Sequence, residues 1–230
     1  MDDNRGMATL DDLLAASLWT RDLDEPTRAR VSAELIERRV AAGGYVCRKG
    51  EPVEHWIGVI EGLLKLSNVS PTGKSVTLTG VPALGWFGEG SVLKDEPRRY
   101  DVVALRESRV ALMPRATFQW LLDTSIPFNR FLLTQLNERL AWFISMLEHE
   151  RLLETDARVA RCLASLFNPI LYPGGGDRLA ISQEEIGFLS GVSRQRVNQA
   201  LQVLEKEGLL AIEYGGLTIL DVEGLRTYGS

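Results

Sequence analysis

The chain changes its pattern of apolar and polar positions twice. Between about residues 40 and 113, short apolar runs are punctuated by glycines, which is typical of short strands joined by tight turns. We expect strands at residues 56–60, 63–69, 75–79 and 101–105. No helical pattern separates these runs, so they predict an antiparallel β-roll or sandwich rather than a parallel α/β sheet.

Helical patterns flank the predicted roll on both sides. Residues 114–122 predict a short helix, and Ile126-Pro127 break the chain before a long helix over about residues 128–155. Its apolar residues recur at steps of three and four: Leu133, Leu136, Leu140, Phe143 and Leu147. This is the seam of a two-stranded coiled coil, so we expect self-dimerisation along the helix. Packing of the same face on the chain's own roll is the alternative.

The last third of the chain contains a helix, a turn and a second helix. Ser182 and Glu185 form a capping-box pattern that starts a helix. Gly187 offers a contact point without a side chain where two helices cross. Gly191 permits a sharp, left-handed turn, and Ser193 is placed to cap the next helix. The spacing predicts a helix-turn-helix.

The second helix of this motif has an unusual outer surface. Val197, Leu201 and Leu204 define its buried face, and Gln195, Gln199 and Gln202 point nearly opposite, with Arg196 and Asn198 on the flanks. Arginine pairs with guanine, and asparagine or glutamine with adenine, in the major groove of DNA. The helix therefore has the side chains of a DNA-reading element. A helical hairpin used only for packing would not explain this polar face.

Residues 209–213, the turn at 214–216 and residues 217–220 predict a β-hairpin behind the second helix, which makes the motif a winged helix. The expected fold class is α+β. We expect a β-roll sensor domain with flanking helices over residues 1–125, a central dimerisation helix over 126–155, and a winged helix-turn-helix DNA-binding domain over 156–230.

The composition neither demands nor forbids this function. With 230 residues, 45% hydrophobic and 25% charged, the chain has ordinary globular composition. Its net charge of -5 is unfavourable for a wholesale nucleic-acid binder, so positive potential must be confined to one face. We expect a cytoplasmic protein without a membrane partner, because no apolar run is long enough to span a bilayer and the N-terminus has no signal-peptide pattern.

The glycine-rich roll, the long helix and the run from Ile186 to Val197 resemble the cAMP receptor protein/FNR (Crp/Fnr) family of bacterial transcription regulators. The resemblance covers most of the chain. It implies a homodimer that places two recognition helices in successive major grooves of an inverted repeat, with half-sites about one helical turn apart. The resemblance also implies RNA polymerase as a candidate partner.

By the same resemblance Arg194, Gln195 and Gln199 occupy base-contacting positions. Many relatives carry Glu and Arg where this chain has Gln195 and Gln199, so its operator should differ from the best-known family sites. The full set expected to bind DNA is Ser182, Ser193, Arg194, Gln195, Arg196, Asn198 and Gln199.

Residues 87–99 resemble the family's cyclic-nucleotide cassette, in which Glu89 would accept a ribose hydroxyl and Arg99 would pair with the cyclic phosphate. Tyr100-Asp101 depart from the pattern, because Tyr100 would crowd the pocket and an inward Asp101 would repel a phosphate. Where cAMP-binding relatives present Thr-Ser from the central helix, this chain aligns Phe143-Ile144. The expected effector-binding set is Glu89, Arg99, Tyr100, Phe143 and Ile144.

Three interpretations of the roll stay open: a cyclic nucleotide, a more apolar small molecule, or a pocket without a ligand in which Glu89 and Arg99 only brace the roll. We expect no cofactor. The two cysteines, Cys47 and Cys162, are too few for an iron–sulfur cluster. Haem would need an axial ligand, and the only histidines, His55 and His149, are each expected to be a surface or packing residue. A β-roll metalloenzyme would need several ligands inside the roll, which contains only His55, so we expect no enzyme. A nucleotide-binding subunit that acts on a protein partner would leave the winged helix without a purpose.

Overall fold

Two four-stranded antiparallel sheets form the roll in the computed structural model of the protein, which describes residues 8–69, 75–152, 154–173 and 176–229. One sheet has the strand order β1-β8-β3-β6 and the other β2-β7-β4-β5. The strands are β1 (Ile36–Val40), β2 (Tyr45–Cys47), β3 (His55–Glu61), β4 (Leu63–Val69), β5 (Ser75–Pro82), β6 (Trp86–Phe87), β7 (Asp101–Ala104) and β8 (Ser108–Pro114). The predicted antiparallel roll is confirmed, and each of the four expected strands is present.

The inner faces of the two sheets enclose a buried apolar cluster. Val59, Leu64, Phe87 and Val102 lie in it with almost no exposed surface. Alternate residues of β3, β4 and β7 belong to this cluster, as in Ile57 with Val59, Leu64 with Leu66 and Val102 with Ala104, because successive side chains of a strand point to opposite faces. We call this cluster the roll core.

Helices close the roll at its ends: α1 (Leu10–Ala16), a short 3-10 helix (Leu18–Thr20), α2 (Glu25–Glu34), α3 (Glu89–Lys94) and α4 (Arg115–Thr124). They meet over a second buried cluster built from Trp19, Trp56, Trp86, Phe118 and Phe128. The centroids of neighbouring rings lie 4.4–5.7 Å apart, mostly in edge-to-face contact. These aromatic contacts fix the start of the long central helix against the roll.

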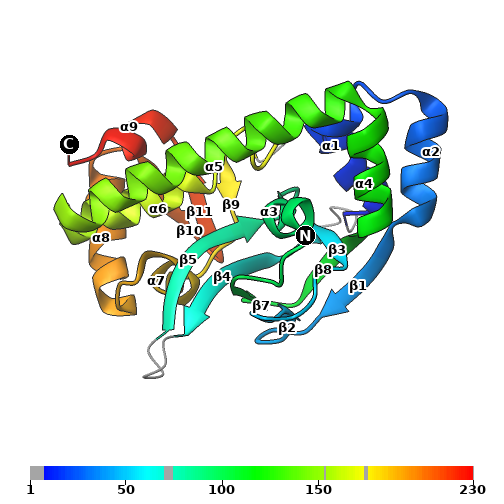
Figure 1. The fold of residues 1–230 in the computed structure, drawn as a ribbon. Coiled ribbons are helices and arrows are strands. Elements are labelled where there is room, and N and C mark those ends of the chain that lie inside the picture. The colour runs from blue at the N-terminus through cyan, green and yellow to red at the C-terminus, as the bar shows by residue number, and fades with distance from the viewer. Residues whose placement is uncertain (1–7, 70–74, 153, 174–175, 230) are drawn as a thin grey trace.

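The central helix α5 (Ile126–Leu152) runs along the length of the molecule (Figure 1). It begins two residues earlier than the sequence pattern predicted. Pro127 does not break the chain, because a proline in the first helical turn has no hydrogen bond to lose. The inner face of α5 carries Phe128, Leu132 and Gln135, all buried.

The C-terminal part contains α6 (Thr155–Ser165), β9 (Arg178–Leu179), α7 (Gln183–Ser190), α8 (Arg194–Lys206), β10 (Leu210–Glu213), β11 (Gly216–Ile219) and α9 (Val222–Thr227). The strands form one sheet in the order β10-β11-β9. The helices and sheet share a core around Leu163, Ile186, Leu201 and Leu217. The predicted helix-turn-helix with its hairpin is therefore confirmed.

The C-terminal part lies against the roll in this structure. Helix α7 packs beside β5 (Figure 1), and the apolar core of the C-terminal part extends to Leu63 of β4. None of the helices in the described part of the chain is both long and apolar enough to cross a membrane.

Candidate nucleic-acid interface and sensor cavity

Helix α7 starts as the capping-box pattern predicts. The Ser182 hydroxyl accepts a hydrogen bond from the Glu185 amide at 3.2 Å, and a Glu185 carboxylate oxygen accepts one from the Ser182 amide at 2.7 Å. Two amides at the start of the helix are thereby satisfied. The capping box therefore fixes Ser182 at the N-terminus of α7, the first helix of the motif.

The turn between the two helices depends on two glycines. Gly191 ends α7 with a φ of +67°, the left-handed conformation that disfavours other residues. At Gly187, an added Cβ would lie 2.7 Å from the carbonyl oxygen of Val192. A close contact is therefore present at Gly187, as expected, but the opposing backbone is that of Val192 in the turn between α7 and α8 and not of a crossing helix.

Gly187→Ala should lower the stability of the winged helix by about 1–3 kcal/mol, because the backbone at Val192 has to move away from the new methyl group. Gly90→Ala is the matched control, since an added Cβ there meets nothing within 4 Å. Thermal unfolding of the two variants checks this. Equal melting temperatures for the two variants would show that the contact at Gly187 accommodates a methyl group without loss of stability.

Helix α8 separates a buried face from an exposed one. Ser193 caps it by accepting a hydrogen bond from the Arg196 amide at 3.4 Å. Val197, Leu201 and Leu204 are fully buried, as predicted. The side chains that are exposed on the first two turns are Arg194, Gln195, Arg196 and Gln199. Within the described residues, neither Arg194 nor Arg196 has an acidic partner, so both charges are available to an anionic ligand.

Asn198 behaves differently from the other polar residues of α8. It is half-buried, and its side-chain oxygen accepts a hydrogen bond from the Gln183 amide group at 3.0 Å. It therefore ties α8 to α7 in this structure. The wing adds a residue that the sequence did not single out: Tyr214, at the tip of the β10–β11 hairpin, is fully exposed.

In the roll, Glu89 pairs with a different arginine from the one expected. Glu89 is 2% exposed, and one of its carboxylate oxygens accepts a hydrogen bond from Arg139 Nε at 2.6 Å. Arg139 comes from α5 and also donates to the Trp86 carbonyl. Burial works to lower the pKa of Arg139, but the adjacent Glu89 carboxylate, together with Tyr172 and Tyr100, outweighs burial and holds that pKa above its ordinary value.

Arg99 points away from the interior of the roll, so the expectation that it pairs with Glu89 or lines the effector site is wrong for this structure. Its guanidinium is two-thirds exposed and pairs with Glu96. Arg98 is buried instead. It donates to the carbonyls of Gly88, at 3.4 Å, and of His55. Successive residues before β7 point to opposite faces, so Arg98 and Tyr100 face the roll while Arg99 and Asp101 do not.

Tyr100 crowds the roll as expected, because it packs against the roll core beside Glu89. Burial raises the pKa of Tyr100 to about 12, with the nearby Glu89 carboxylate adding to the effect, so its phenol is protonated at neutral pH. Asp101 points away from the core, and its carboxylate accepts a hydrogen bond from the Lys49 amide at 2.8 Å. The repulsion expected from an inward Asp101 on a bound phosphate is thus absent here.

The remaining predicted effector residues lie on the outer part of α5. Phe143 is half-buried against Trp142, with ring centroids 4.8 Å apart, and Ile144 is half-exposed. Neither belongs to the roll core. Their expected contact with an effector stays a prediction.

The predicted dimer seam is an exposed apolar stripe in the single chain. Leu133 and Leu140 are 68% and 59% exposed, and Leu136 and Phe143 are half-buried. Leu147 lies outside the residues whose side chains the structure describes. Large aliphatic side chains with this exposure on a regular stripe indicate a surface that a partner covers.

Of the two cysteines, Cys47 is buried and Cys162 is partly buried. Burial raises the pKa of Cys47 to about 11 and that of Cys162 to about 12, so both thiols are protonated at neutral pH. Within the described ranges, no cluster of three or more histidine, cysteine or acidic residues has the arrangement of a metal site.

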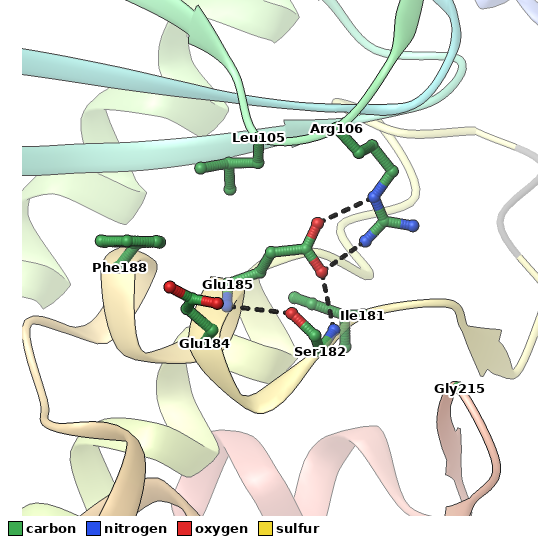
Figure 2. Close-up of a pocket in the computed structure, with 8 residues that line it drawn as sticks. All are labelled: Leu105, Arg106, Ile181, Ser182, Glu184, Glu185, Phe188 and Gly215. Carbon is green, nitrogen blue, oxygen red and sulfur yellow. Dashed lines mark hydrogen bonds and ion pairs between the residues drawn. The ribbon is translucent and has the colours of Figure 1, made fainter. Parts of the chain in front are cut away.

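The roll and the helix-turn-helix meet in an ion pair. Arg106, in the loop between β7 and β8, donates two hydrogen bonds to the Glu185 carboxylate, at 2.7 and 2.8 Å (Figure 2). A groove of about 400 Å³ lies beside this pair, lined by Leu105, Ser182, Phe188 and Gly215 among others. Figure 2 shows Ser182, at the start of α7, on the wall of this groove next to Glu185.

A β-roll joined by a long helix to a winged helix with an exposed arginine and glutamine face defines a two-domain DNA-binding regulator. Comparison with known families agrees: residues 37–125 match the cyclic nucleotide-binding domain, and residues 157–228 match the Crp-like helix-turn-helix domain. The chain belongs to the Crp/Fnr family of transcription regulators.

Individual relatives resemble the chain over most of its length. It is 28% identical to a CRP-like cAMP-activated global transcriptional regulator of Mycobacterium tuberculosis, over 94% of this chain and 98% of that protein. It is 29% identical to the transcriptional regulator LdrP of Thermus thermophilus, over 82% and 94%. A solved CRP-family transcriptional regulator, also from Thermus thermophilus, is 27% identical, with a TM-score of 0.56 over 84% of this chain and 97% of that one.

Proposed function

We propose that this protein is a homodimeric transcription regulator that binds an inverted-repeat operator through α8. The observation that carries the proposal is the exposed face of α8, where Arg194, Gln195 and Gln199 stand free above a fully buried apolar face. These side chains form paired hydrogen bonds with base edges. Ser182, Ser193, Arg196 and the wing would hold the phosphate backbone, and Asn198 would keep α7 and α8 in register.

The apolar stripe of α5 supports the homodimer. Two copies that pair through Leu133, Leu136 and Leu140 would carry two α8 helices related by a two-fold axis. Such a pair reads two half-sites about 34 Å apart, one turn of B-DNA. The domain limits of this proposal are residues 1–125 for the sensor, 126–155 for the dimerisation helix and 156–230 for DNA binding.

We infer that a small molecule in the roll modulates DNA affinity, and that the protein acts in the cytoplasm without catalysing a reaction. Phe143 and Ile144 would reach such a molecule in the dimer, and RNA polymerase is the expected partner at promoters. A cyclic nucleotide is one candidate effector, because relatives are described as cAMP-activated. Arg98, rather than Arg99, is the arginine placed for its phosphate, although both Arg98 and Arg139 already bind backbone carbonyls.

Selection of bound duplexes from a random DNA pool tests the proposed function. We expect enrichment of an inverted repeat whose half-site centres lie about ten base pairs apart. The half-sites should contain guanine and adenine contacts suited to Arg194, Gln195 and Gln199. Recovery of no enriched sequence would contradict the proposal.

A further inference from the structure

One hydrogen bond joins the side chains of the two helices in the helix-turn-helix. The side-chain nitrogen of Gln183, the first residue of α7, donates to the side-chain oxygen of Asn198 in α8 at 3.0 Å. Both side chains are half-buried. The two residues are 15 positions apart in the sequence, so the bond depends on how α7 and α8 pack.

The apolar core beneath the bond fixes both of its ends. Ile186 of α7 and Val197 and Leu201 of α8 are buried in one cluster. The capping box sets the start of α7 at Ser182, one residue before Gln183. Gln183 therefore approaches Asn198 from a fixed backbone, and the hydrogen bond sets the direction of the Asn198 amide.

Asn198 lies at the edge of the exposed face of α8. At about 100° per residue, it is turned by roughly 60° from Gln195 and by roughly 100° from Gln199. It also follows Arg194 by about one helical turn. All three of these neighbours are exposed. A base contacted by this face would therefore lie close to the Asn198 amide.

The hydrogen bond determines which group of Asn198 is available to DNA. Its side-chain oxygen is directed to Gln183, so its side-chain nitrogen, which has two N–H donors, is on the other side of the amide. Among the described residues, no acceptor is bonded to this nitrogen. Paired recognition of adenine by asparagine needs both the oxygen and the nitrogen. The engaged oxygen therefore leaves Asn198 as a donor alone.

Guanine is the base that fits such a donor best. Its major-groove edge has two neighbouring acceptors, N7 and O6. Cytosine presents the N4 donor there, adenine places the N6 donor beside its N7 acceptor, and thymine has one acceptor next to a methyl group. A fixed N–H donor at this place in the groove should therefore select guanine.

We propose that Gln183 is a positioning residue for sequence recognition. It holds the Asn198 amide so that Asn198 reads one guanine in each half-site as a hydrogen-bond donor. The inference rests on the proposed function, because it requires α8 in the major groove. It adds a residue of the first helix, which itself contacts no base, to the determinants of the operator sequence.

Two variants reverse the hydrogen-bonding character of Asn198 by different routes. In Gln183→Glu the carboxylate can only accept, so the Asn198 amide turns its nitrogen toward α7 and its oxygen toward DNA. In Asn198→Asp the donor is removed, while the carboxylate still accepts from Gln183. Both variants should replace the guanine by adenine or cytosine, whose N6 and N4 groups donate.

Gln202→Glu is the matched control, since it makes the same change of charge at an exposed position of α8. It should keep the guanine. Gln183→Ala is a further variant that adds no charge. It frees the Asn198 amide to rotate, so the preference for guanine should weaken without passing to another base. Thermal unfolding shows whether each variant has kept its fold.

Selection of duplexes from a random DNA pool with each full-length variant tests the proposal. The base that changes with Asn198→Asp identifies the contacted position. Fluorescence anisotropy then compares the selected operator with a duplex that carries adenine at this position in both half-sites. Wild type and Gln202→Glu should prefer the guanine duplex by about tenfold or more, and Gln183→Glu and Asn198→Asp should lose or invert this preference.

A guanine that persists in the operator selected by folded Gln183→Glu would overturn the proposal, as would an operator that Asn198→Asp leaves unchanged. Adenine or cytosine at the contacted position of the wild-type operator would also overturn it. In these cases the wild-type chain still selects an operator, so the proposed function stands. If the wild-type chain enriches no sequence, the proposed function fails and the role of Gln183 fails with it.

Discussion

A protein that carries Gln195→Ala and Gln199→Ala together should bind its selected operator no better than random DNA. Both side chains are exposed on the first two turns of α8. Each paired contact with a base contributes about 1–3 kcal/mol of discrimination. A homodimer carries both changes twice, so the loss is roughly 4–12 kcal/mol, the size of the whole gap between specific and random DNA.

Gln202→Ala is the control for this result. Gln202 is also an exposed glutamine of α8, but it lies farther from the N-terminal turns that read bases. We expect its operator affinity to stay within about threefold of wild type. Fluorescence anisotropy with labelled operator and labelled random duplex measures both variants. If the double variant kept its preference for the operator, α8 would not be the element that reads the bases.

Leu133→Glu together with Leu140→Glu should convert the dimer to monomers. The two side chains are 68% and 59% exposed in the single chain, so the fold of each chain should survive the change. In the dimer they would place like charges in an apolar seam, which costs several kcal/mol for each buried carboxylate. The monomer should also lose most of its operator affinity, because one chain reaches one half-site.

The control variant is Thr134→Glu with Ala141→Glu, which adds the same charges at the same spacing on the same helix. These exposed positions are turned by roughly 100° from Leu133 and Leu140. Sedimentation velocity should show monomers for the stripe variant and dimers for the control. A stripe variant that sediments like wild type would place the dimer interface elsewhere.

The parts of the structure that follow from local sequence could be predicted. The capping box at Ser182, the left-handed turn at Gly191 and the buried face of α8 involve residues within a few positions of one another. The strands followed from glycine spacing and apolar runs. The resemblance to the Crp/Fnr family predicted that the roll precedes the winged helix. The matches to the cyclic nucleotide-binding domain and to the Crp-like helix-turn-helix domain agree with that order.

The interior of the roll could be predicted only in part, because its contacts join distant segments. Glu89 pairs with Arg139, fifty residues away, and no local pattern marks that pair. The correct arginine could have been found: Val102 and Ala104 face inward, so alternation along the strand assigns Arg98 and Tyr100 to the same face. The packing of Leu171 and Tyr172 into the roll core had no such signal, since both residues lie in a proline-flanked loop that resembles a surface turn.

Titration of the full-length protein with the selected operator and with the same duplex scrambled in one half-site tests the central claim most directly. At one fixed salt concentration, we predict that two chains bind the intact duplex at least about a thousandfold more tightly than random DNA. Scrambling one half-site should bring the affinity close to the random value. Equal affinity for the intact and scrambled duplexes would contradict the account of a two-fold, base-reading regulator.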